Sequence, residues 1–109
     1  VGNGVYARED FIEANPELVQ DIVNTLVVAI DYIIANPKKS AKLWSKATGL
    51  PEEVLNYSVE NKISVFDRDI TPSKETVDAY MAFLKGAGIL KPGDVAKYDS
   101  SFAEKALAQ

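Results

Sequence analysis

Three carboxylates lie close together near the start of the chain, at Glu9, Asp10 and Glu13. Neighbouring carboxyl groups can work as general acid and base when an apolar enclosure raises the pKa of one of them. The surrounding sequence offers no such enclosure, and acidic side chains at the beginning of a helix interact favourably with the helix dipole. We therefore interpret this cluster as the start of a helix rather than as a catalytic pair.

A glycine-rich stretch, Gly2-Asn3-Gly4-Val5-Tyr6-Ala7, nominally fits the dinucleotide-binding fingerprint that ends in alanine. That fingerprint follows a strand and opens a helix, because the pyrophosphate binds at the helix N-terminus. Here the residues after the glycines are themselves strand-like. We interpret the stretch as a flexible approach to a short strand at residues 5–7.

A second acidic group is Asp67-Arg68-Asp69. A calcium-binding loop needs several more oxygen ligands and a glycine at a fixed place, and neither follows. We predict a solvated turn here, with Asp69 acting as an additional cap near Thr71.

Four lysines, Lys38, Lys39, Lys42 and Lys46, form a basic stripe beside Trp44. A basic stripe with an aromatic neighbour is a pattern found in nucleic-acid-binding proteins. The chain as a whole is acidic, which argues against a phosphate-backbone partner. We interpret the stripe as a solvated helix face and expect no nucleic-acid partner.

The composition excludes further chemistry. The chain has 109 residues, with 12 Lys and Arg against 16 Asp and Glu, a formal charge of −4, and neither His nor Cys. Without Cys there are no disulfides, zinc ribbons or thiol nucleophiles, and without His most zinc catalysis and the Ser-His-Asp arrangement are excluded. The residues therefore predict no enzyme, no metal site and no cofactor. The longest apolar run, residues 26–30, is far shorter than the roughly 20 residues of a membrane span.

Proline marks the helix starts. Asn15-Pro16, Asn36-Pro37 and Thr71-Pro72 each place a capping residue type before a proline. Proline suits the first helical position because that position has no intrahelical N–H bond to lose. These signals predict helices beginning near residues 16, 37 and 72, and Leu50-Pro51 is a fourth, less complete case.

The first long helix is predicted over residues 16–35. Its apolar residues recur every three or four positions, at Leu18, Val19, Ile22, Val23, Leu26, Val27, Ile30, Ile33 and Ile34. Full burial of this stripe would contribute on the order of 15–20 kcal/mol as an upper bound, so we expect it to form the spine of the core. Val28 and Tyr32 fall outside the stripe and indicate a second covered surface.

Weaker signals complete the expected fold. Helices are predicted over 37–48, with Gly49 as a left-handed C-cap, over 51–60, from 72 to about 84, and over 101–108, with one or two helical turns over 8–14. Residues 61–70 break the helical pattern, and Ile63 to Phe66 alternate as a short strand would. The expected fold class is mainly α, with about five helices and one or two short strands. The strand at 5–7 needs a partner for its backbone groups.

Three blocks of sequence, in this order and spacing, resemble a known family. They are residues 5–19 (VYAREDFIEANPELV), residues 29–37 (AIDYIIANP) continuing to 49–54 (GLPEEV), and residues 71–102, from Thr71-Pro72 to Tyr98-Asp99-Ser100-Ser101-Phe102. Together they resemble the C-terminal portion of the periplasmic solute-binding proteins of ABC importers, in the nitrate, sulfonate and taurine class that includes thiamine-precursor binders. The resemblance covers nearly the whole chain and depends on order and spacing rather than on a single motif.

The resemblance implies a fold and a division of the chain. Such proteins have two α/β lobes joined by crossover segments, with the ligand held between the lobes. Residues 1–109 would be one C-terminal fragment: 1–14 the returning strand and crossover, 15–60 three helices, 61–70 an extended connection, and 71–109 the C-terminal helices. The sheet that pairs with the strand at 5–7 would belong to the rest of the protein.

The resemblance also implies a function. The complete protein would capture a small solute outside the cytoplasm, as a periplasmic or lipid-anchored protein, and deliver it to an ABC transporter permease. Within this chain the amide of Asn3 would approach the ligand. Two alternatives remain open: a fragment of a thiamine-pyrimidine-synthesis enzyme of the same fold, and a free-standing helical interaction domain. As an isolated fragment the chain is expected to form a homo-oligomer.

Overall fold

The computed structural model describes residues 5–95 and 97–109. Within these ranges it contains six helices and no strand, and 64% of the described residues are helical. The helices are α1 (Glu9–Ala14), α2 (Pro16–Ala35), α3 (Pro37–Thr48), α4 (Glu52–Glu60), α5 (Lys74–Gly86) and α6 (Ser101–Leu107). The predicted mainly helical class is confirmed.

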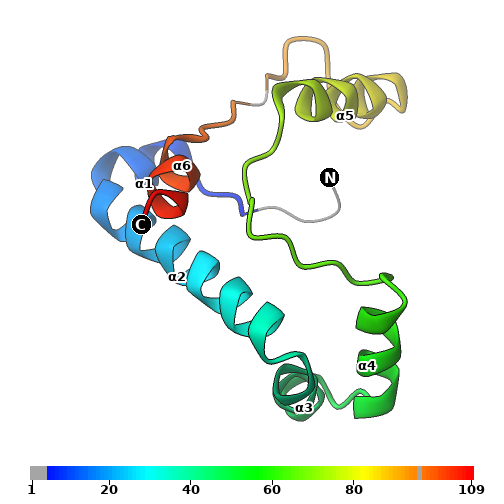
Figure 1. Cartoon of the computed structure of the whole chain (residues 1–109). Coiled ribbons are helices and arrows are strands. Elements are labelled where there is room, and N and C mark those ends of the chain that lie inside the picture. The colour runs from blue at the N-terminus through cyan, green and yellow to red at the C-terminus, as the bar shows by residue number, and fades with distance from the viewer. Residues whose placement is uncertain (1–4, 96) are drawn as a thin grey trace.

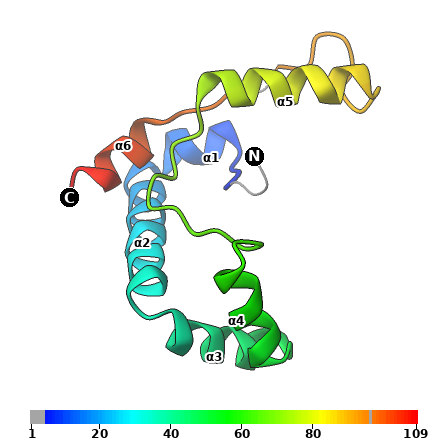
Figure 2. The ribbon, with the colours of Figure 1, turned by 45° about the vertical axis from the view of Figure 1, so that its right-hand side comes forward.

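The longest helix, α2, organises the molecule (Figure 1). Helices α1 and α6 pack at its N-terminal half. Helix α3 follows its C-terminal end, and α4 packs on α3. Helix α5 stands apart from the others in both views (Figures 1 and 2), and in the described part of the chain it packs on no other helix. The radius of gyration is 16.5 Å, against about 13 Å for a compact domain of this length.

The core is small. Its buried apolar residues are Val27, Ala41, Leu55, Ala103 and Ala106. The apolar stripe of α2 was expected to be the spine of the core, but Val27 alone in this helix is buried. This expectation is corrected because α6 covers one side of α2 and no second layer covers the other.

The exposed area shows how open the structure is. The chain exposes 8363 Å², whereas a compact monomer of 11.9 kDa exposes about 6,000 Å². The surplus of about 2,400 Å² includes large apolar side chains of α2, among them Val28 and Tyr32. The helices therefore leave much of their apolar surface exposed.

Helices α2 and α3 begin at the predicted residues, but the predicted capping hydrogen bonds are not formed. Asn15 and Asn36 precede Pro16 and Pro37 as expected, yet neither side chain caps the helix that follows. Each amide instead donates backwards, Asn15 to the Phe11 carbonyl at 3.0 Å and Asn36 to the Tyr32 carbonyl at 3.1 Å. Each of these carbonyls also accepts the backbone N–H of the same asparagine, at 2.9 and 2.8 Å. Both asparagine side chains therefore reinforce the end of the preceding helix instead of capping the next one.

The predicted start of α5 at Thr71-Pro72 is wrong by two residues. Ser73 is the N-cap, and its hydroxyl accepts the backbone N–H of Thr76 at 3.1 Å. The Thr71 N–H donates to the Asp69 carboxylate at 2.9 Å. Because α5 begins only at Lys74, this bond shapes the approach to the helix, and the additional helix cap predicted at Asp69 is not formed. Gly49 ends α3 with φ of 76°, as predicted for a left-handed C-cap.

The structure forms neither of the predicted short strands. Residues 5–7 and 63–66 have no ladder partner in the described chain, and Val5 and Tyr6 are 67% and 82% exposed. An extended segment becomes a strand only when a neighbour satisfies its backbone groups. The two-lobe fold, which would supply that neighbour, stays a prediction.

Helix α2 is long and apolar enough to cross a membrane by length and composition alone. It also carries Glu17, Asp21 and Asp31, and Asp31 forms an ion pair with Arg68. Carboxylates are costly in the hydrocarbon of a bilayer. We therefore treat α2 as an amphipathic packing helix.

Candidate functional site

The predicted acidic cluster lines a shallow depression of about 490 Å³, together with Arg8. The Arg8 guanidinium donates to both carboxylate oxygens of Asp10, at 3.0 and 2.7 Å, and Lys97 pairs with Glu9 at 2.7 Å. The hydrogen bonds from Arg8 lower the pKa of Asp10.

A lowered carboxyl pKa is the opposite of what a general acid requires. Glu9 and Asp10 lie in the first turn of α1, where the interpretation as a helix start placed them. Glu9 and Asp10 therefore belong to exposed ion pairs at a helix N-terminus, and Glu13 lies beside them without an ion-pair partner among the described residues.

The group Asp67-Arg68-Asp69 organises a turn. The carboxylates of Asp67 and Asp69 accept the backbone N–H groups of Asp69 and Thr71, both at 2.9 Å. No group of acidic side chains suited to a metal ion occurs among the described residues. The predicted solvated turn is confirmed, with the addition that Arg68 reaches across to α2.

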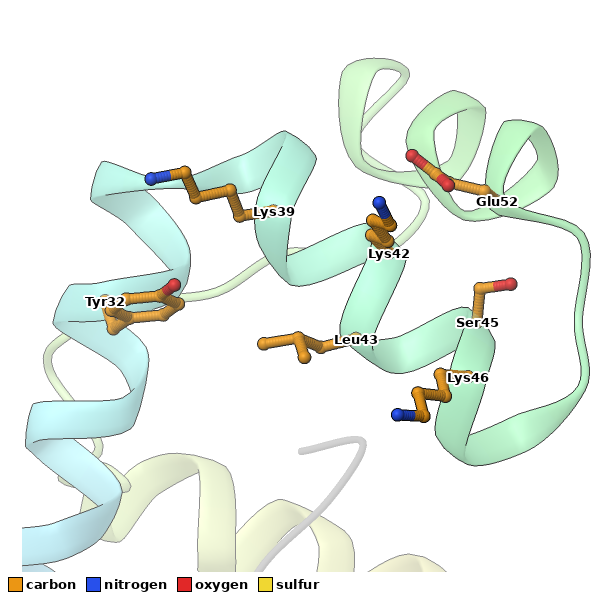
Figure 3. Close-up of a pocket in the computed structure, with 7 residues that line it drawn as sticks. All are labelled: Tyr32, Lys39, Lys42, Leu43, Ser45, Lys46 and Glu52. Carbon is orange, nitrogen blue, oxygen red and sulfur yellow. The ribbon is translucent and has the colours of Figure 1, made fainter.

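The predicted lysine stripe is divided by the fold. Lys39, Lys42 and Lys46, spaced at i, i+3 and i+7 on α3, line an open depression of about 620 Å³, and Lys38 does not line it. The other lining residues are Tyr32 from α2, Leu43 and Ser45 from α3, and Glu52 (Figure 3). We call this set the α3 lysine surface.

The α3 lysine surface is basic with an apolar centre. Figure 3 shows the Leu43 side chain directed toward the Tyr32 ring, with the three lysines around them. Leu43 is 59% exposed. Within the described chain, none of the three lysines forms an ion pair. The surface can therefore accept carboxylate groups and an apolar side chain from a partner.

Trp44 does not belong to this surface. It is half-buried, and its ring packs edge-on against Phe66, with centroids 6.1 Å apart and planes at 82°. This contact fixes the 61–73 connection against α3. The indole is therefore engaged within the chain, which removes the aromatic neighbour from the nucleic-acid pattern considered above.

Two sites predicted from the sequence cannot be located in this structure. The proposed ligand-contacting Asn3 and the glycines of the dinucleotide pattern lie outside the described residues. The apolar part of the α3 lysine surface was not predicted, although Tyr32 was noted as falling outside the apolar stripe. Its pairing with Leu43 depends on the angle between α2 and α3, which no local pattern encodes.

Comparison of the chain with protein-family models, with curated proteins and with solved structures gives no match. The assignment of function therefore depends on the residues, on their geometry and on the sequence resemblance described above.

Proposed function

We propose that this chain is the C-terminal portion of an extracytoplasmic solute-binding protein of an ABC importer. The solute would be a sulfonate, nitrate or a thiamine precursor, as in the class that the sequence resembles. The observation that carries the proposal is the openness of the structure: it exposes about 2,400 Å² more total surface than a compact monomer, and large apolar side chains such as Val28 and Tyr32 are part of that exposed surface. Helices that cover the sheet of a larger lobe have this property when considered alone.

The segment at residues 5–7 supports the same proposal. Val5 and Tyr6 lie outside any helix, are highly exposed and are β-branched and aromatic, respectively, which are residue types that strands favour. A strand returning from a second lobe would complete its backbone hydrogen bonds by joining a sheet outside this chain.

In this proposal the mechanism is closure of two lobes around the solute, followed by docking on a membrane permease. Closure of this kind is a hinge motion concentrated in the segments that cross between lobes. Residues 1–14 would contain one such crossover, with the Asn3 amide positioned to hydrogen-bond a polar or anionic solute. The helices would supply the scaffold and part of the docking surface.

Titration calorimetry with taurine, nitrate and an aminopyrimidine tests the proposal. The experiment compares the 109-residue chain with the polypeptide encoded when the reading frame is extended upstream. We expect the extended protein to bind one of these solutes and the 109-residue chain to bind none. Binding by the short chain alone, or an upstream sequence without solute-binding lobes, would contradict the proposal.

A further inference from the structure

We propose that two copies of this 109-residue chain pair antiparallel through the exposed face of α2, each placing its α3 lysine surface against the acidic N-terminal end of the other copy's α2. This inference concerns the chain on its own and does not depend on the proposed function. A failure of pairing would leave the solute-binding experiment above unaffected.

The contact surface is a stripe on α2 at alternating spacings of four and three residues. It consists of Leu18, Ile22, Thr25, Ala29 and Tyr32, and all five are exposed. Alternating spacings of four and three residues are typical of the contact positions in paired helices. The smaller side chains of Thr25 and Ala29 allow the two helix axes to approach closely. We call these five residues the α2 seam.

The α2 seam is free because α6 occupies the other side of the helix. Gln20 donates to the Phe102 carbonyl of α6 at 2.9 Å, and the buried Val27 lies nine residues after Leu18, half a turn around α2. Leu18, Ile22 and Tyr32 are 49%, 43% and 45% exposed. A second helix can therefore reach the seam without displacing α6.

The charges near the two ends of α2 favour an antiparallel orientation of the two copies. Glu13 in α1, and Glu17 and Asp21 in the first turns of α2, are exposed around the N-terminal end of α2, and in the described part of the chain they take no part in an ion pair. Lys39, Lys42 and Lys46 lie at the other end, beyond a 20-residue helix about 30 Å long.

A parallel pair would place like charges together, whereas an antiparallel pair places the acidic end of one copy against the basic end of the other, twice. A two-fold arrangement of this kind closes on itself as a dimer rather than growing into a filament.

The exposed area of the chain is compatible with an interface. A standard protein interface buries about 800 Å² on each partner, and the surplus of total surface, summed over all elements of this chain, is about three times that area. A second copy of the chain is also a suitable partner because it carries its own acidic surface, formed by Glu13, Glu17 and Asp21. These carboxylates can form ion pairs with the three lysines of the α3 lysine surface.

Sedimentation equilibrium at about 50 mM salt, where screening is weak, tests the pairing with complementary charge reversals. One variant carries Lys39→Glu, Lys42→Glu and Lys46→Glu; the other carries Glu13→Lys, Glu17→Lys and Asp21→Lys. We expect each variant alone to lose at least tenfold in dimer affinity, and the equimolar mixture to recover the dimer, because opposite charges then face each other. The matched control, Lys62→Glu with Lys85→Glu and Lys91→Glu, changes the net charge equally and retains dimer affinity.

Disulfide cross-linking tests the orientation without changing charge, since the natural chain has no Cys. Antiparallel pairing brings Leu18 of one copy near Tyr32 of the other, within reach of a disulfide. Leu18→Cys mixed with Tyr32→Cys should therefore form a mixed cross-linked dimer on mild oxidation, whereas Leu18→Cys alone should not cross-link. A monomeric natural chain, a mixture of charge variants that stays monomeric, or cross-linking of Leu18→Cys with itself would overturn the proposal.

Discussion

The Arg68 guanidinium joins the middle of the chain to α2 through Asp31, 37 residues away in sequence. Its Nε lies 3.0 and 3.2 Å from the two carboxylate oxygens of Asp31, and its Nη1 donates to the Leu107 carbonyl of α6 at 3.5 Å. One side chain thus links the 61–73 connection, α2 and the last turn of α6. The bridge acts together with the Trp44–Phe66 ring contact, which holds the same connection against α3.

Arg68→Ala should release the 61–73 connection from α2. Both partners are nearly half exposed, so the loss in unfolding free energy is about 0.5–1 kcal/mol, measured by urea denaturation. Amide hydrogen exchange should become faster in residues 61–73 and at the end of α6. Arg8→Ala, which removes a more exposed pair with Asp10, is the control. An equal loss of stability in both variants would show that the Arg68 bridge has no special role.

Leu55→Ala should cost about 2–3 kcal/mol, at the low end for a buried leucine because the small core can relax around the cavity. Leu55 is 3% exposed and lies where α4 packs on α3. The neighbouring Val54, 51% exposed on the same helix, supplies the control, and Val54→Ala should change the unfolding free energy by less than about 0.5 kcal/mol. Similar costs for the two variants in urea denaturation would contradict the described packing of α4.

Ser73→Ala should unwind the first turn of α5. The lost hydroxyl accepts the Thr76 N–H, and removal of such a cap costs about 1 kcal/mol of helix stability. Since α5 packs on no other described helix, the loss should appear as local fraying in NMR chemical shifts rather than as global unfolding. Thr71→Ala should leave α5 unchanged. If Thr71→Ala frays the helix and Ser73→Ala does not, the sequence-based start was correct after all.

Acid should loosen α6 from its first turn. The hydroxyl and backbone N–H of Ser101 hold the pKa of Asp99 below its ordinary value. A lowered folded-state pKa means that this contribution is complete above the unfolded-state pKa of about 3.9 and is lost as pH falls through the folded-state value.

An NMR carboxyl titration should therefore place Asp99 below the ordinary aspartate pKa. In Ser101→Ala its pKa should move back toward the ordinary value. A titration of Asp99 at or above the ordinary value in the natural chain would contradict the hydrogen bonding described here.

The sequence predicts the local elements closely and the packing poorly. The bounds of α2 and α3 follow from Pro16, Pro37 and Gly49, because these residues act on the backbone within one turn. The strand at residues 5–7 and the burial of the α2 stripe were expected and are not formed, because each requires a partner that a local pattern cannot supply.

The candidate site also combines a part that local sequence predicts with a part that depends on packing. The lysines of α3 are visible as a stripe in the sequence, since helical spacing alone groups them. Tyr32 and Leu43 join them only through the turn at Asn36, where α2 ends and α3 begins. Predicting the complete surface therefore required the tertiary structure.

We expect the exposed apolar face of α2 to be a contact surface for another polypeptide. Sedimentation equilibrium of the unmodified 109-residue chain, from micromolar to millimolar concentration, measures that contact without any substitution. We predict a molecular mass that rises with concentration from 11.9 kDa toward twice that value. A mass that stays at the single-chain value over the whole range would contradict the claim.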